Sequence, residues 1–188
     1  MKTFILVYDS FAHFEVILSA LFLKEKSEII TVGINKNIVT STEGFRVMPH
    51  ITINEVVNDE VDVFIIPGGE PEKLYKCDEL YSLISDLHKL NKVIGAVCAG
   101  PIHLAKANIL KGKRFTTSLN TNGVEEFKGA EYVDQNVVID GNIITAKASG
   151  YVDFAIEIGK IMNIYKDEDD LTETIDFFKF FKSQNRET

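Results

Sequence analysis

Short apolar runs alternate with longer amphipathic segments along most of the chain. The runs at residues 3–8, 27–34, 62–66 and 92–97 are rich in Val, Ile, Leu and Phe. Continuous apolar runs of this length are typical of parallel strands that are covered by helices on both faces. We therefore predict that these four segments are neighbouring strands of one parallel sheet.

The segments between the runs carry apolar residues at helical spacing. In residues 14–26, for example, Phe14, Ile17, Leu18 and Leu21 fall on one stripe, which predicts a helix directly after the first strand. The same period predicts further helices at residues 79–90, 100–110, 151–162 and about 168–183.

Two segments indicate hairpins. Residues 39–57 contain Gly44 and Pro49 with weak alternation, which favours an edge hairpin followed by a connection back to the sheet. Asp140-Gly141 stands between the predicted strands 132–140 and 142–146, and this dipeptide is a strong signal for a two-residue turn.

Strands that alternate with helices predict an α/β fold. We expect a three-layer α-β-α sandwich around a doubly wound, mostly parallel, flavodoxin-like sheet. The length of 188 residues suits a single domain over residues 1–188. Its last helix, at about 168–183, is expected to dock on the core or at a dimer interface.

Charge and hydropathy narrow the possible partners. The net charge is −8, from 28 acidic and 20 basic residues, and no Lys/Arg cluster could follow a phosphate backbone, so we expect no nucleic-acid partner. The longest apolar stretch, residues 16–23, is far shorter than a membrane helix, so no membrane partner is expected either. The first apolar run lacks the features of a signal peptide, and we expect a cytoplasmic protein.

The two cysteines, Cys77 and Cys98, are too few for a disulfide framework and lack metal-ligand spacing. We therefore expect reduced thiols and no metal. No cofactor is expected either.

Cys98 has the sequence context of a nucleophile elbow. Residues 95–101 read Gly-Ala-Val-Cys-Ala-Gly-Pro and lead from a predicted strand directly into a predicted helix. A sharp strand-to-helix turn strains the central residue and tolerates only small neighbours. The nearby helix N-terminus favours thiolate, which predicts a lowered pKa for Cys98. The alternative is a small buried hydrophobic residue, the commoner role of a free cysteine.

Two other segments should lie beside this elbow. Gly68-Gly69 follows a neighbouring strand, where backbone N–H groups could stabilise an oxyanion together with the N–H of Ala99. Glu15 lies just inside the first predicted helix. Taken alone, Gly-Gly is an ordinary turn signal and Glu15 an acid that stabilises a helix dipole.

Together, Glu15, Gly68-Gly69 and Cys98 resemble the ThiJ/PfpI (DJ-one) superfamily, which has a class I glutamine amidotransferase-like fold. The resemblance covers nearly the whole chain. It implies that the carboxyl group of Glu15, usually as the protonated acid, hydrogen-bonds Cys98. It also implies that the Gly68-Gly69 loop helps to form the oxyanion site.

The chain departs from the superfamily at two positions. Ala99 stands where the protease-like branch has a histidine, which argues against peptidase activity. Ser118 lies where many DJ-one relatives carry a histidine near the cysteine, so the usual third catalytic group is absent. His13 is the best substitute and His103 the second, although each also fits an ordinary helix position.

Three functional hypotheses follow. The first is a cysteine-dependent hydrolase or lyase on small carbonyl, amide or isonitrile substrates, glyoxalase- or deglycase-like. The second is an oxidative-stress sensor in which an oxidant converts Cys98 to sulfenic or sulfinic acid, with Cys77 a candidate resolving thiol. The third is a noncatalytic binding module on the same fold. A homodimer is expected because four phenylalanines cover more than one face of the last helix: Phe177, Phe178, Phe180 and Phe181.

Overall fold

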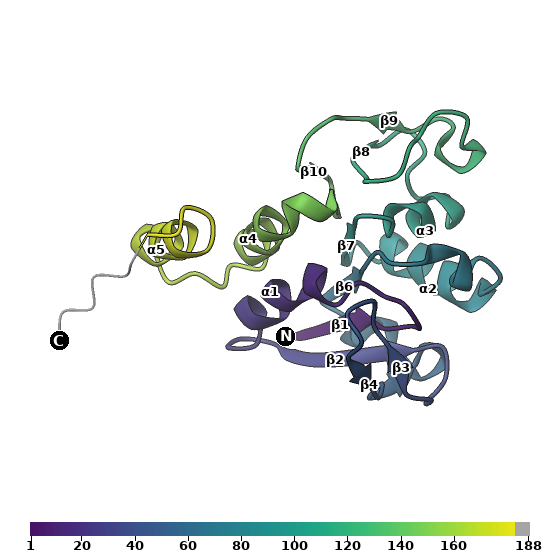
Figure 1. Ribbon diagram of the computed structural model, residues 1–188, viewed down its shortest axis with the longest axis horizontal. Helices are drawn as coiled ribbons and strands as arrows, with labels where there is room; N and C mark the ends of the chain where they lie inside the picture. Colours follow the sequence, from purple (N-terminus) through teal and green to yellow (C-terminus); the bar gives the residue numbers. More distant parts are fainter. Residues whose placement is uncertain (183–188) are drawn as a thin grey trace.

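The computed structural model describes residues 1–182, which fold around a seven-stranded sheet (Figure 1). The order of the strands is β10-β11-β7-β6-β1-β2-β5. Their bounds are β1 Lys2–Leu6, β2 Glu28–Gly33, β5 Ile51–Thr52, β6 Val63–Ile66, β7 Val93–Val97, β10 Val137–Asp140 and β11 Ile143–Ala146.

All neighbouring strands pair in parallel except β10 and β11. The five central strands, in the order β2-β1-β6-β7-β11, follow the doubly wound flavodoxin-like pattern. The prediction of a mostly parallel α/β sheet is therefore confirmed. The hairpin turn lies one residue later than its signal suggests: Asp140 pairs with Ile143, so Gly141 and Asn142 form the loop, and Gly141 has a φ of 63°.

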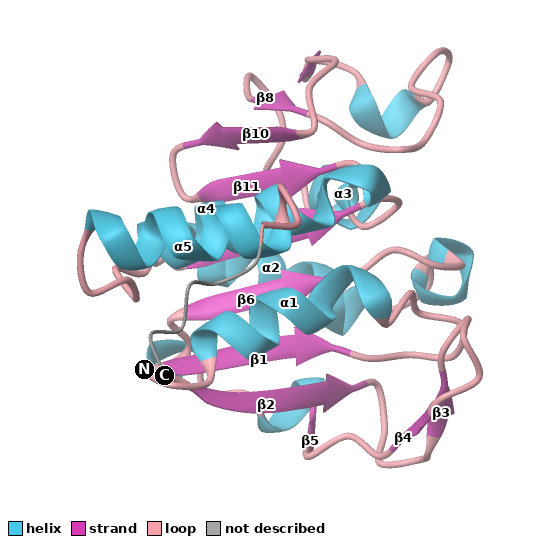
Figure 2. Cartoon of the chain, turned by 60° about the vertical axis from the view of Figure 1, so that its left-hand side comes forward, coloured by secondary structure: helices cyan, strands magenta, loops and turns pink. Residues whose placement is uncertain are grey.

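Helices cover both faces of the sheet (Figure 2). The helices α1 (Phe14–Leu23) and α4 (Tyr151–Ile161) lie on one face, and α2 (Asp78–Lys89) and α3 (Pro101–Lys106) on the other. Each side has its own apolar core. Val16, Phe154 and Ile158 pack on the first face, and the second holds a larger cluster that includes residues of both α2 and α3. Burial on both faces explains why the strands read as continuous apolar runs.

The helix α5 (Glu168–Phe178) lies outside these layers, next to α4 (Figure 1). None of its residues is fully buried. The ring of Phe178 packs edge-on against that of Phe22 at 4.9 Å between centroids, and Lys179 pairs with Asp153 of α4 at 2.6 Å. Its carboxyl end comes earlier than predicted, at Phe178, and residue 183 lies outside the described residues.

The remaining short strands form two small pairs. The strand β3 (Val39–Thr40) pairs antiparallel with β4 (Arg46–Val47), and this pair is the expected hairpin. The chain then returns to the main sheet, where β5 pairs with β2 at the edge. The strand β8 (Arg114–Phe115) pairs with β9 (Glu131–Tyr132). No helix within residues 1–182 is long and apolar enough to cross a membrane.

Candidate active site at the Cys98 elbow

Cys98 occupies a sharp turn between β7 and α3. Its φ of 58° lies in the left-handed region, which is unfavourable for a residue with a side chain. Gly100 makes the turn possible, because a Cβ atom at this position would lie 2.6 Å from the carbonyl oxygen of Ile66. The small residues around the cysteine therefore have the steric role that the sequence predicts.

Hydrogen bonds fix the backbone of the elbow on both sides. The N–H of Cys98 donates to the carbonyl of Ala146 at 2.8 Å. The carbonyl of Cys98 accepts from the hydroxyl of Thr117 at 2.6 Å and from the N–H of Ser118 at 3.0 Å. The strained conformation is thus held by partners from two other segments of the chain.

Glu15 lies next to the elbow, within the protein. Its side chain is 2% exposed, and its Oε2 accepts a hydrogen bond from the N–H of Gly68 at 2.7 Å. A Cβ atom at Gly68 would stand 2.7 Å from the Cβ of Cys98 and 2.9 Å from both Oε2 of Glu15 and the nitrogen of Ala99. Gly68 is therefore the point where the predicted groups meet, and no larger residue fits there.

Burial raises the pKa of Glu15, although the N–H of Gly68 and the thiol of Cys98 hydrogen-bond its carboxylate. Burial, together with the negative charge of Glu15, also raises the pKa of Cys98 to about 11. The prediction of a lowered thiol pKa is wrong, because α3 begins only at Pro101 and is six residues long, and burial beside a carboxylate outweighs its dipole.

The backbone N–H groups predicted for the oxyanion site have different surroundings. That of Ala99 lies beside the sulfur of Cys98 and favours its charged form. Gly69 has a φ of 116°, and within residues 1–182 its N–H has no hydrogen-bond partner. The N–H of Gly68, in contrast, is bound to Glu15, so it is not available to an oxyanion.

Ser118 lies against Cys98 at the position where relatives of this type often carry a histidine. Its Oγ accepts a hydrogen bond from the N–H of Ala148 at 2.9 Å, and its hydroxyl lowers the pKa of Cys98, although burial dominates. A serine hydroxyl has no basicity near neutral pH. Ser118 can therefore orient the sulfur but cannot take the place of a histidine base.

The two histidines considered as substitutes lie elsewhere. The ring of His13 packs edge-on between Phe11 and Phe45, at 5.5 Å from each. His103 is fully buried and lies 6.1 Å from the ring of Tyr81, with burial lowering its pKa to about 4. The structure brings neither ring to Cys98.

Cys77 is also separated from Cys98. Cys77 packs against the core cluster beneath α2 and α3, whereas Cys98 packs against the cluster on the opposite face of the sheet. The structure therefore offers no resolving thiol next to Cys98. Within residues 1–182, no group of three or more His, Cys, Asp or Glu side chains could hold a metal ion.

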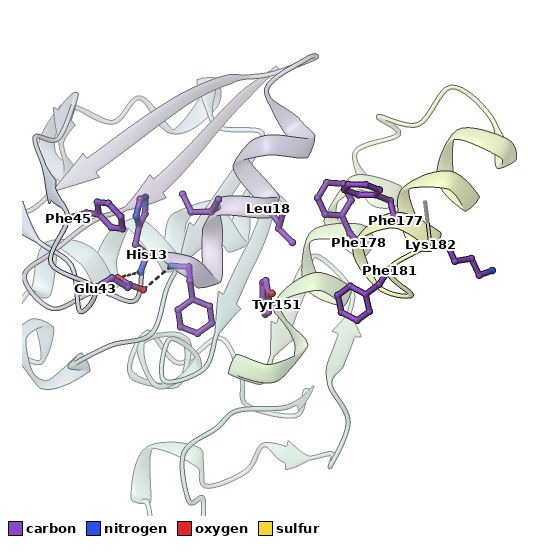
Figure 3. A pocket seen from close by; sticks show the side chains of 11 residues that line it. His13, Leu18, Glu43, Phe45, Tyr151, Phe177, Phe178, Phe181 and Lys182 are labelled. Carbon is purple, nitrogen blue, oxygen red and sulfur yellow. Dashed lines mark hydrogen bonds between the residues drawn. The ribbon is translucent and has the colours of Figure 1, made fainter. Parts of the chain in front are cut away.

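A groove of about 890 Å³ opens beside the amino end of α1 (Figure 3). Glu43 on its rim accepts hydrogen bonds from the N–H groups of His13 and Phe14, at 3.2 and 3.0 Å, and so caps α1. Neither Cys98 nor Glu15 lines the groove. Its walls are mostly apolar and include Phe14, Ile17, Tyr151, Phe177, Phe178 and Phe181.

Sequence reasoning missed Tyr8 and Glu43. The hydroxyl of Tyr8 donates to the carbonyl of Gly68 at 2.7 Å, within the protein. A polar tip at the carboxyl end of an apolar strand was the available signal for Tyr8. No sequence pattern links Glu43 to α1.

The fold and the elbow define a class of protein: a doubly wound α/β sandwich with a cysteine at the strand-to-helix turn. Comparison with known sequences makes the assignment specific, because a sequence model of the DJ-1/PfpI family matches residues 1–160. The chain belongs to this family, as the sequence motifs indicate.

Named relatives are similar over most of their length. The chain is 29% identical to a deglycase, PfpI, from Pyrococcus furiosus, over 80% of this chain and 92% of the relative. It is 32% identical to a glutathione-independent glyoxalase from Caenorhabditis elegans, over 70% of this chain and 71% of the relative. A DJ-1 superfamily protein from Agrobacterium tumefaciens shares the fold, with a TM-score of 0.86, 24% identity and coverage of 97% and 100%.

Proposed function

We propose that this protein is a cofactor-independent enzyme that converts small α-oxoaldehydes to 2-hydroxy acids, with Cys98 as the nucleophile. The observation that carries the proposal is the convergence of Cys98, Glu15 and the N–H of Ala99 at Gly68. Relatives named as a glyoxalase and as deglycases support the same choice of substrate class.

The chemistry needs no external oxidant. As the carboxylate of Glu15 takes the thiol proton, the sulfur of Cys98 bonds to the aldehyde carbon, and the aldehyde oxygen gains negative charge beside Gly69 and Ala99. Glu15 returns this proton to that oxygen, which gives a hemithioacetal and restores the carboxylate. Glu15 then moves the former aldehyde hydrogen, as a proton, to the neighbouring carbon, while the hydroxyl proton of the hemithioacetal passes to the adjacent carbonyl oxygen. The product is a thioester of the 2-hydroxy acid. Water hydrolyses the thioester and restores the thiol.

The raised pKa of Cys98 fits this scheme better than it fits a redox sensor. Peroxide reacts with thiolate, which is scarce near neutral pH when the pKa is about 11. Carbonyl addition, in contrast, can begin from the thiol if a carboxylate is placed to remove its proton. Because no histidine base adjoins the thiol, we expect turnover to be slow.

The test is lactate formation from methylglyoxal without glutathione. We expect Cys98→Ala and Glu15→Gln to abolish turnover and Cys77→Ala to retain it, because Cys77 lies on the other side of the sheet. Equal turnover by Cys98→Ala and the wild type would overturn the proposal. A wild type without turnover, but with one sulfinic acid formed at Cys98 per chain under mild peroxide, would favour the sensor.

We also propose that a second copy of the chain covers the apolar groove between α1 and α5. Phe14 and Phe181 there are 46% and 89% exposed, and contiguous exposed apolar surface commonly marks an interface. Analytical ultracentrifugation should detect a dimer that Phe177→Glu converts to a monomer. Leu90→Glu, at an equally exposed apolar residue after α2, should leave the dimer intact. A monomeric wild type would contradict this assembly.

A further inference from the structure

The peptide group between Gly68 and Gly69 links Tyr8 to the predicted oxyanion site. The carbonyl of this trans peptide belongs to Gly68, and its N–H belongs to Gly69. The carbonyl accepts hydrogen bonds from the hydroxyl of Tyr8 at 2.7 Å and from the N–H of Ala12 at 3.0 Å. The two ends of a trans peptide point in opposite directions, so these bonds also fix the direction of the Gly69 N–H.

The pairing of the loop gives that direction. Gly69 forms an isolated antiparallel bridge with Phe11, flanked by bonds from Ala12 N–H to Gly68 and from Glu70 N–H to Ser10. In this arrangement the bridged residues do not bond each other, and their N–H groups point away from the partner segment. The N–H of Gly69 therefore points away from residues 10–12, and within residues 1–182 it has no hydrogen-bond partner, so it is free to bind an oxyanion.

We infer that Tyr8 is a positioning residue for the oxyanion donor, a role that rests on the proposed function. Its hydroxyl holds and polarises the Gly68–Gly69 peptide from the carbonyl end. A hydrogen bond to a carbonyl strengthens the N–H of the same peptide as a donor, because linked hydrogen bonds polarise one another. Tyr8 touches no reacting atom and acts only through this peptide.

Two features suit Tyr8 to this role. It is 3% exposed at the end of the central strand β1, so water does not compete for the Gly68 carbonyl. Burial raises the pKa of Tyr8, so its hydroxyl stays protonated and remains a donor at every pH where the protein would work. The φ of 116° at Gly69 makes this restraint important, because a glycine could otherwise adopt other conformations.

Tyr8→Phe removes only the hydroxyl, and Tyr81→Phe is the matched control. The hydroxyl of Tyr81 also donates to a backbone carbonyl, that of Leu74 at 3.0 Å, beneath α2 and away from Cys98. Both variants lose one hydrogen bond of the same type. A purely structural role for Tyr8 would therefore give the two variants similar effects.

Two readouts test the role. Loss of an oxyanion donor typically costs 10²–10³ in kcat, so a misplaced donor should lower kcat roughly tenfold with KM unchanged. In the ¹H–¹⁵N NMR spectrum, the Gly69 amide proton should move upfield in Tyr8→Phe. Tyr81→Phe should change neither quantity.

The NMR readout does not depend on turnover. An unchanged Gly69 amide resonance in Tyr8→Phe would overturn the inference, as would equal losses of kcat in the two variants. A wild type that shows no turnover with any α-oxoaldehyde would instead overturn the proposed function, and with it the role of Gly69 as an oxyanion donor. The two failures are thus distinguishable.

Discussion

The α-carbon of Gly100 faces the carbonyl oxygen of Ile66 so closely that an added methyl group would stand 2.6 Å from that oxygen. Because this oxygen belongs to the end of β6, the contact joins the nucleophile turn to the neighbouring strand. The backbone of Gly100 itself is unstrained, with a φ of −52°. Its lack of a side chain is therefore a packing requirement.

Gly100→Ala should accordingly destabilise the fold by roughly 1–3 kcal/mol, the usual cost of overpacking. Urea unfolding monitored by circular dichroism gives the free energy of unfolding. Gly44→Ala is the comparison, because its φ of 90° is strained but no atom lies within 4 Å of its added Cβ. It should cost only about 1 kcal/mol. A smaller loss for Gly100→Ala than for Gly44→Ala would contradict the packing explanation.

The thiol of Cys98 should resist alkylation at neutral pH. With a pKa of about 11, its rate constant with iodoacetamide should rise about tenfold per pH unit from about pH 7 to about pH 10 without levelling off. Peptide mass spectrometry in a Cys77→Ala background measures this rate. A plateau below pH 9 would show that the thiol titrates normally.

Glu15→Gln should lower the pKa of Cys98, because it removes the negative charge that opposes the thiolate. The same alkylation series should then show faster reaction at every pH below 10. Glu79→Gln is the control, since Glu79 lies beside Cys77 and not beside Cys98. Identical profiles for wild type and Glu15→Gln would mean that the two groups are not coupled.

His103 should make the fold sensitive to mild acid. Burial lowers its pKa in the folded state to about 4 from its ordinary 6.5, and neither ring nitrogen has a partner within residues 1–182. The unfolded chain therefore binds the proton at a higher pH than the folded protein does. The free energy of unfolding falls as the pH drops from about 6.5 toward 4. Between pH 7 and pH 5 the loss should be about 2 kcal/mol.

His103→Leu should remove most of that pH dependence in urea unfolding at the two pH values. His50→Gln, at an exposed histidine just before the edge strand β5, should retain it. If the free energy of unfolding of His103→Leu fell between pH 7 and pH 5 by as much as that of the wild type, another group would be responsible.

Glu43→Ala should uncap α1. Its carboxylate accepts from two first-turn N–H groups, and although its partial burial opposes the charge, these bonds lower its pKa to about 2. The contribution of Glu43 to the free energy of unfolding is fully present above pH 4.5, the ordinary pKa of a glutamate. It is lost as the pH falls toward 2. At neutral pH the substitution should cost about 1 kcal/mol in urea unfolding. Glu25→Ala, which removes an exposed carboxylate just after α1, should cost almost nothing.

The sequence predicted those features that depend on short stretches of chain. Continuous apolar runs identified the central strands, and small residues around Cys98 identified the turn. The raised pKa of Cys98 was not predictable in this way, because it depends on how deeply Glu15 and the thiol are buried together. Likewise, helical spacing could not show that His103 points into the core and that His13 packs between two phenylalanines.

The groups around Cys98 come from segments far apart in the chain, the last of them at Ala146 and Ala148. During synthesis on the ribosome, the thiol therefore emerges well before its surroundings exist. The nascent chain carries an ordinary, unpartnered cysteine until β11 has joined the sheet. Chains that stop short of residue 148 should consequently lack the site, and their cysteine should react with alkylating agents faster than the buried thiol of the complete site does.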